Sequence, residues 1–195
     1  GDTFTIPSGA TLTNSGTATG FDGGLVPLTQ STGSSYVDNI VVNGWVSDTY
    51  ENYIMYYDVT PSTNGADIRM TLYDSSGNLS GSEYSYIHSG ADATSGAYQQ
   101  MSQTGQTSFS IGNNVHNDSA RIGLSGYMVW KHPRLASKRS TFITHFKMLD
   151  NTPTLKHFDG VMEYKASEAL TGFYLEPASG QLKNWRIRCY GIVNS

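Results

Sequence analysis

The chain lacks the features that would cross-link it through disulfides or anchor it in a bilayer. It has a single cysteine in 195 residues, so no disulfide can form within it. No apolar run approaches the roughly 20 residues that a membrane-spanning helix needs, so no membrane insertion is expected. Rigidity must therefore come from packing or from association between subunits. Cys189 alternates with Trp185 and Ile187, which predicts a small buried hydrophobe and not a reactive thiol.

Catalytic signatures are also missing. There is no G-x-S-x-G elbow and no phosphate-binding glycine loop. The acidic residues late in the chain have no recognisable arrangement, whereas glycoside cleavage needs two carboxylates about 5 to 10 Å apart. The five histidines show no ligand spacing along the chain; they are His88, His116, His132, His145 and His157. We therefore expect no enzyme activity, no metal and no cofactor.

Charge is sparse and unevenly distributed. Charged residues make up 14% of the chain, and the formal net charge is −4. Residues 1–120 hold 11 acidic residues and one basic residue, whereas residues 121–195 hold 5 acidic and 11 basic residues. The net charge disfavours nucleic acid as a partner. The split predicts two surfaces that compensate each other in the fold, although it could also steer subunits together or form a face for an anionic ligand.

What the chain does have is period-two alternation. Tyr53, Met55, Tyr57 and Val59 share one strand face, and a second strand with Ile68 in its apolar face follows a Pro/Asn/Gly turn. Strands are expected near 36–42, 51–59, 67–73, 82–88, 107–112, 121–132, 139–149, 156–165, 170–175 and 182–193. With no amphipathic helix between them, these segments predict an all-β fold, an antiparallel β-sandwich or jelly roll.

The first 23 residues differ from the rest. Threonines alternate there with a narrow apolar stripe that contains Phe4, Ile6 and Leu12. Such a stripe cannot stabilise itself, because an isolated hairpin is marginal in water. We expect a leader over 1–23 that packs either on the main domain of residues 24–195 or on equivalent segments of other subunits, as a trimerising stalk.

Two regions carry the mixture of aromatic and polar side chains that saccharide binding requires. One leads into 89–105, a stretch with little periodicity that is expected to be a long exposed connection. The other ends the strand at 121–132. The candidate ligand-binding residues are Tyr84, Tyr86, His88, Tyr98, Gln99, Trp130, His132 and Arg134. The alternative is that these rings make packing or subunit contacts. His145 lies opposite the apolar face of its strand, so a surface or interface position is expected.

The leader G-D-T-F-T-I-P-S-G-A-T-L-T-N-S-G-T-A-T-G-F resembles the threonine-rich segment of tail-fibre and other structural proteins of tailed bacteriophages, particularly marine and cyanobacterial ones. The stretch from V-S-D-T-Y-E-N-Y to I-R-M-T-L-Y and the closing W-R-I-R-C-Y-G-I-V-N-S resemble the β domain that follows it. The family offers no shared catalytic residues to transfer.

This resemblance implies an extracellular virion component: a homotrimeric fibre or spike tip, attached to other tail proteins. Its β domain would be a receptor-binding domain for a host-surface polysaccharide or lipopolysaccharide. Two alternatives stay open. One is a structural knob or decoration protein without a ligand, and the less favoured one is a polysaccharide depolymerase.

Overall fold

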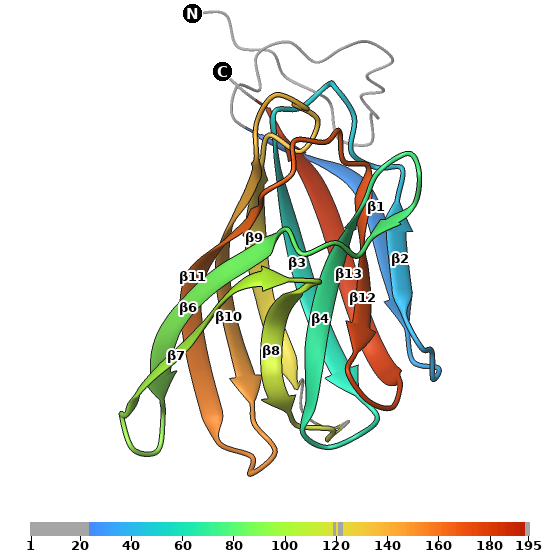
Figure 1. The fold of residues 1–195 in the computed structure, drawn as a ribbon. Coiled ribbons are helices and arrows are strands. Elements are labelled where there is room, and N and C mark those ends of the chain that lie inside the picture. The colour runs from blue at the N-terminus through green and yellow to red at the C-terminus, as the bar shows by residue number, and fades with distance from the viewer. Residues whose placement is uncertain (1–23, 119, 121–122, 194–195) are drawn as a thin grey trace, which may run out of the picture.

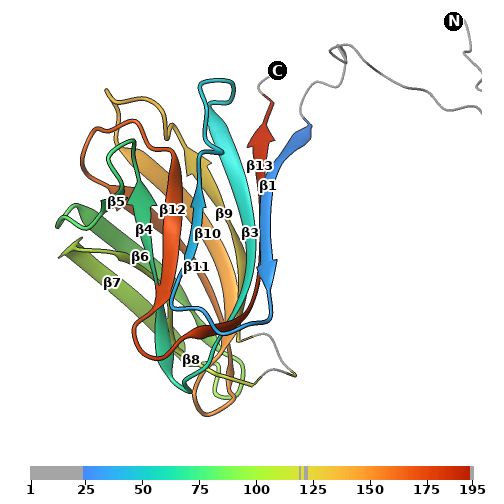
Figure 2. The ribbon, with the colours of Figure 1, turned by 90° about the vertical axis from the view of Figure 1, so that its right-hand side faces the viewer.

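Two antiparallel β-sheets pack face to face in the computed structural model, which describes residues 24–118, 120 and 123–193 (Figure 1). The side view shows the two layers edge on (Figure 2). The expected leader over 1–23, with its proposed subunit contacts Phe4, Ile6 and Leu12, lies outside the described residues. No helix in the described ranges has the length and apolar character needed to cross a membrane.

The larger sheet has eight strands in the order β1-β13-β3-β9-β10-β11-β6-β7, and every neighbouring pair is antiparallel. Its strands are β1 (Leu25–Gly33), β13 (Leu182–Ile192), β3 (Asn52–Pro61), β9 (Leu124–Lys131), β10 (Ser140–Leu149), β11 (Leu155–Tyr164), β6 (Tyr84–Asp92) and β7 (Tyr98–Gln106).

The smaller sheet has β4 as its central strand. On one side β4 pairs with β12, which pairs in turn with β2. On the other side, β5 pairs with one end of β4 and β8 with the other end. Its strands are β2 (Ile40–Asn43), β12 (Gly172–Pro177), β4 (Ala66–Tyr73), β5 (Asn78–Leu79) and β8 (Phe109–Val115).

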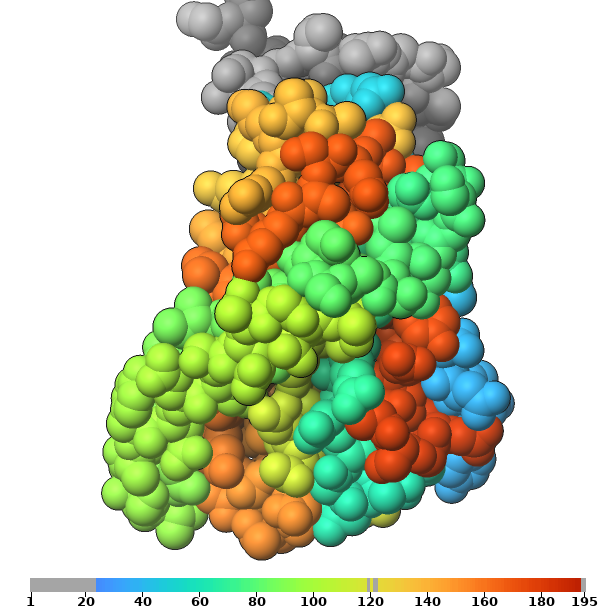
Figure 3. Space-filling view, viewed as in Figure 1, coloured from blue at the N-terminus to red at the C-terminus, as the bar shows by residue number. Residues whose placement is uncertain are grey.

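The connectivity is that of a jelly roll with additions. Without β5, β6, β7, β10 and β11, two four-stranded sheets remain, β1-β13-β3-β9 and β2-β12-β4-β8. The chain passes back and forth between them at every step except β4 to β8, which both lie in the smaller sheet; this is the jelly-roll arrangement of two Greek keys. Of the added strands, β10, β11, β6 and β7 extend the larger sheet beyond β9, while β5 pairs with β4 in the smaller sheet. The β6–β7 hairpin projects to one side of β8 (Figure 3). The predicted all-β antiparallel class is confirmed.

The core lies between the sheets and follows the alternation read from the sequence. Tyr53, Met55, Tyr57 and Val59 are buried on the inner face of β3, as predicted. From the second sheet, β4 contributes its own buried alternate residues, and aromatic rings from both sheets meet at Trp45, which contacts rings of β3, β9 and β12. Burial of this apolar area is the main stabilising contribution.

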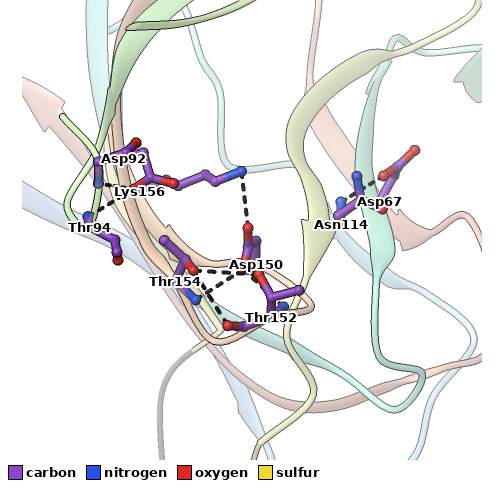
Figure 4. A network of polar contacts seen from close by, with 9 residues as sticks. Asp67, Asp92, Thr94, Asn114, Asp150, Thr152, Thr154 and Lys156 are labelled. Atoms are coloured by element: carbon purple, nitrogen blue, oxygen red, sulfur yellow. Dashed lines mark hydrogen bonds and ion pairs between the residues drawn. The ribbon is translucent and has the colours of Figure 1, made fainter. Parts of the chain in front are cut away.

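The expectation of a long exposed connection over 89–105 is wrong. The segment is a hairpin in which β6 and β7 pair from Ala91 and Tyr98 onward. Its turn is closed by the carboxylate of Asp92, which accepts hydrogen bonds from the backbone N–H groups of Thr94 (2.8 Å) and Ser95 (2.9 Å) (Figure 4). Gly96 has a φ of +67°, a conformation that glycine adopts without strain. The strand gave no periodic signal because β7 is an edge strand with few apolar residues.

Candidate functional site

The outer face of the eight-stranded sheet, the face that points away from the smaller sheet, carries a row of apolar side chains. Strand pairing places Ile54, Val129, Ile143, Val161 and Ile87 side by side on β3, β9, β10, β11 and β6. The last three are 47%, 51% and 45% exposed. They line a shallow hollow of about 480 Å³ between β6, β11 and β10. Side chains in register on neighbouring strands lie close together, and we call these five residues the apolar row. Its exposed part is Ile143, Val161 and Ile87, because Val129 is half-buried and Ile54 is buried.

A row of rings runs beside it. Tyr56, Tyr127 and His145 lie two residues from the apolar row on their own strands, whereas Tyr190 is in register with Ile54 and His157 lies four residues from Val161. Tyr190, Tyr56, Tyr127, His145 and His157 follow one another with ring centroids 6.0, 5.9, 5.3 and 4.9 Å apart. Tyr127 and His145 are stacked, with 23° between their planes. This ring row comes from β13, β3, β9, β10 and β11. His145 therefore lies on the exposed side of its strand, as the sequence predicted.

Charged groups flank the rings at the β13 side. Arg186 and Arg188 are exposed on β13, and Arg186 is paired in register with Asp58 on β3. Ser125 donates a hydrogen bond of 2.7 Å to the Asp58 carboxylate. A hollow of about 390 Å³ lies here; its lining is Tyr56, Tyr57, Asp58, Ser125, Gly126, Arg186, Arg188 and Tyr190. The pairing of Asp58 with Arg186 shows how the fold mixes the acidic first part of the chain with its basic second part.

At the other end of the ring row, three potential metal ligands meet. His145 Nδ1 lies 2.7 Å from Asp159 Oδ1, and His157 Nε2 lies 3.1 Å from Asp159 Oδ2. His157 and Asp159 are alternate residues of β11, while His145 faces Asp159 from β10. Sequence reasoning missed this cluster because it looked for ligand spacing along one segment, whereas the third ligand arrives by strand pairing. The detectable signal was H-x-D on one strand with a histidine on a neighbouring one.

Three of the predicted ligand-binding residues are buried. Trp130, which looked exposed at the end of its strand, is 2% exposed, and its Nε1 donates to Ser140 Oγ at 2.5 Å. Tyr84 is fully buried; its hydroxyl donates to the carbonyl of Leu79 (2.6 Å), and burial raises its pKa. His88 is fully buried as well. Their assignment to a ligand-binding surface is wrong, because side chains packed between the sheets cannot reach a saccharide. These three residues make packing contacts instead, which was the alternative interpretation.

Two predicted residues do meet in a hollow. His132 Nδ1 lies 3.0 Å from Glu51 Oε1, and Arg134 Nε donates to Asp48 Oδ1 at 3.1 Å. The strand end and the loop before β3 thus form a depression of about 360 Å³, which we call the loop hollow. Its lining is Asp48, Thr49, Tyr50, Glu51, His132, Arg134 and Leu135.

The remaining three predicted residues lie elsewhere. Tyr86 is half-buried and stacks on the ring of His88 with centroids 5.6 Å apart. Tyr98 is 69% exposed at the start of the edge strand β7, and Gln99 follows it, half-buried. The eight predicted residues therefore do not form one site.

Comparison of the chain with protein-family models found no match, and comparison with curated proteins found none either.

Proposed function

We propose that this chain is the receptor-binding tip of a tailed-bacteriophage fibre, which assembles as a homotrimer through the outer face of its eight-stranded sheet and attaches the virion to a host-surface glycan. The assignment to a bacteriophage virion rests on the resemblance of the leader and of the two β segments quoted above to tail-fibre proteins. The observation that carries the assembly is the exposed part of the apolar row beside the ring row. Adjoining exposed apolar side chains with polar neighbours are a feature of interaction surfaces.

The occupant that fits this face best is further copies of the same chain. The face offers Arg186 and Arg188 on β13 and the carboxylate of Asp159 on β11, four strands away. Strands are spaced about 4.8 Å apart, so the two charge groups are separated by about 19 Å. A rotated copy can bring the arginines of one subunit against the Asp159 carboxylate of the next while the apolar rows pack together. Such a heterologous contact closes into a ring when the rotation is one third of a turn.

Saccharide binding then falls to surfaces outside the interface. The loop hollow fits this role because Asp48, Glu51 and Arg134 can bond sugar hydroxyls, and Tyr50 supplies an aromatic ring in the same lining. Three weak sites on one rigid body gain avidity without tighter individual contacts. This combination supports attachment and requires no catalytic residue.

Sedimentation of the full chain tests the assembly. We expect a trimer, and we expect the double variant Ile143→Asp plus Val161→Asp to sediment as a folded monomer, because two carboxylates would lie in the apolar row. The matched control is Val41→Asp, at an apolar side chain that is 48% exposed on the smaller sheet, and it should remain trimeric. A wild-type chain that stays monomeric at high concentration would refute the proposed assembly.

Binding to host polysaccharide and lipopolysaccharide tests the attachment. Wild-type trimer should bind, and the Arg134→Ala variant should bind more weakly while remaining trimeric. A trimer that binds no host surface would support the structural knob instead. Release of reducing ends from the polysaccharide would favour the depolymerase.

A further inference from the structure

We propose that His145, His157 and Asp159 form a binding site for one divalent transition-metal ion of the zinc class, a property that does not depend on the proposed attachment function. His145 would bind through Nδ1, His157 through Nε2 and Asp159 through its carboxylate. Their ligand atoms all lie within 4.8 Å of one another.

The distances fit a metal with little rearrangement. In a tetrahedral zinc site with bonds of 2.0 to 2.2 Å, neighbouring ligand atoms are about 3.3 Å apart. The two histidine–carboxylate distances are 2.7 and 3.1 Å. These two contacts need to open by only a few tenths of an ångström, and the exposed side chains must also bring the remaining ligand atoms, which lie within 4.8 Å of one another, to the same spacing.

The backbone beneath holds the three ligands in place. Phe158 separates His157 from Asp159 and is buried against Phe146, with stacked rings 5.2 Å apart. This packing fixes the β10–β11 pair, so the H-x-D ligands and the histidine opposite them stay on one face. The ring of Tyr127 stacks on His145 and limits its rotation. A preorganised ligand set loses less conformational entropy on binding.

The ligand types select the class of ion. Two imidazoles and one carboxylate suit zinc, copper, nickel or cobalt, whereas calcium and magnesium prefer all-oxygen sites. The side chains are 46%, 49% and 61% exposed, which leaves a coordination position that water can reach. Lys147 is paired in register with His157 on the same face. Its positive charge opposes a bound cation, so it should weaken the site.

Calorimetric titration of the untagged, chelator-treated full chain with Zn²⁺ tests the site. We expect one saturable ion per chain, and visible absorption of Co²⁺ in a low-symmetry environment when cobalt replaces zinc. His157→Ala and Asp159→Asn should each weaken binding by more than about 100-fold, beyond the 10- to 100-fold typical of losing a supporting group. Lys147→Gln should tighten it.

The matched control is His132→Ala. His132 also lies 3.0 Å from a carboxylate oxygen, that of Glu51, but belongs to no cluster of three potential ligands in the described residues. Its loss should leave the Zn²⁺ affinity unchanged. The proposal is overturned if wild-type protein shows no saturable binding, or if the His157 and Asp159 variants bind as tightly as wild type. Asp159 also belongs to the proposed subunit contact, so His157→Ala, which leaves that carboxylate in place, separates the two proposals: it should lose Zn²⁺ binding and still sediment as wild type does in chelator.

Discussion

Asp150 and Lys156 form an ion pair across the turn between β10 and β11, with Oδ2 and Nζ 3.0 Å apart (Figure 4). The other carboxylate oxygen accepts hydrogen bonds from Thr152 N (2.9 Å), Thr152 Oγ1 (2.8 Å) and Thr154 N (3.0 Å). Burial alone would raise the pKa of Asp150, but these donors hold it at about 2. The carboxylate thus fixes the turn that sets the register of the two strands.

Asp150→Asn should lower the free energy of unfolding by about 2 kcal/mol, because hydrogen bonds to a charged acceptor contribute about 1.5 to 3 kcal/mol each and the amide keeps only part of them. Since the pKa is depressed in the folded state, this contribution is present above pH 4 and disappears as the pH falls towards 2. Urea unfolding of wild type and of Asp150→Asn at several pH values measures this contribution to the free energy of unfolding. Equal stability of variant and wild type at pH 7 would contradict this role.

His88 should make the protein sensitive to mild acid. Neither ring nitrogen has a hydrogen-bond partner among the residues that the structure describes, and the ring contacts those of Tyr86 and Phe146. Burial lowers its pKa to about 4. The neutral ring is favoured in the fold, so stability is retained above the unfolded pKa of about 6.5 and falls by about 3 kcal/mol as the pH drops to 4.

His88→Leu removes this titration. The free energy of unfolding of the variant, relative to that of wild type, should therefore rise as the pH falls from 7.5 to 4. Subtracting the unfolding free energy of wild type from that of the variant cancels the titration of the other histidines, because both proteins contain them. A difference that is independent of pH would show that His88 does not titrate in this range.

Trp130 should be a stability residue and not a binding residue. Its ring stacks on Phe142 with centroids 5.1 Å apart and meets Trp45 at 5.8 Å. Trp130→Ala should cost about 3 to 5 kcal/mol, as expected for loss of a buried aromatic side chain. Tyr98→Ala, at an exposed edge position, should change stability by less than about 0.5 kcal/mol. Thermal unfolding compares the two variants. Equal losses of stability would contradict the assignment of Trp130 to the core and of Tyr98 to the surface.

Alternation along single strands could be read from the sequence because it depends only on local geometry. It gave the buried faces of β3 and β4 and the burial of Cys189, which is 1% exposed. It did not identify Trp130 as a core residue. Its strand alternates Met128 and Trp130 inward with Tyr127 and Val129 outward, and both sets are apolar, so the pattern alone does not say which set faces the second sheet.

The candidate site depends on pairing between distant segments, which alternation does not reveal. The ring row requires β13 beside β3 and β3 beside β9. His145 meets Asp159 only because the turn fixed by Asp150 has one particular length. These relationships are set by sheet register, a property of the whole fold.

The strict alternation of buried and exposed residues in β10 makes the strand tolerant of some substitutions and intolerant of insertions. Phe142, Thr144, Phe146 and Met148 are buried, while Ile143, His145 and Lys147 between them are exposed. Substitutions at the exposed positions can change the chemistry of the outer face without altering the core. A single-residue insertion has the opposite effect, because it moves the exposed residues inward and the core residues outward. Variation of this face should therefore proceed by substitution, and length changes should be confined to the loops.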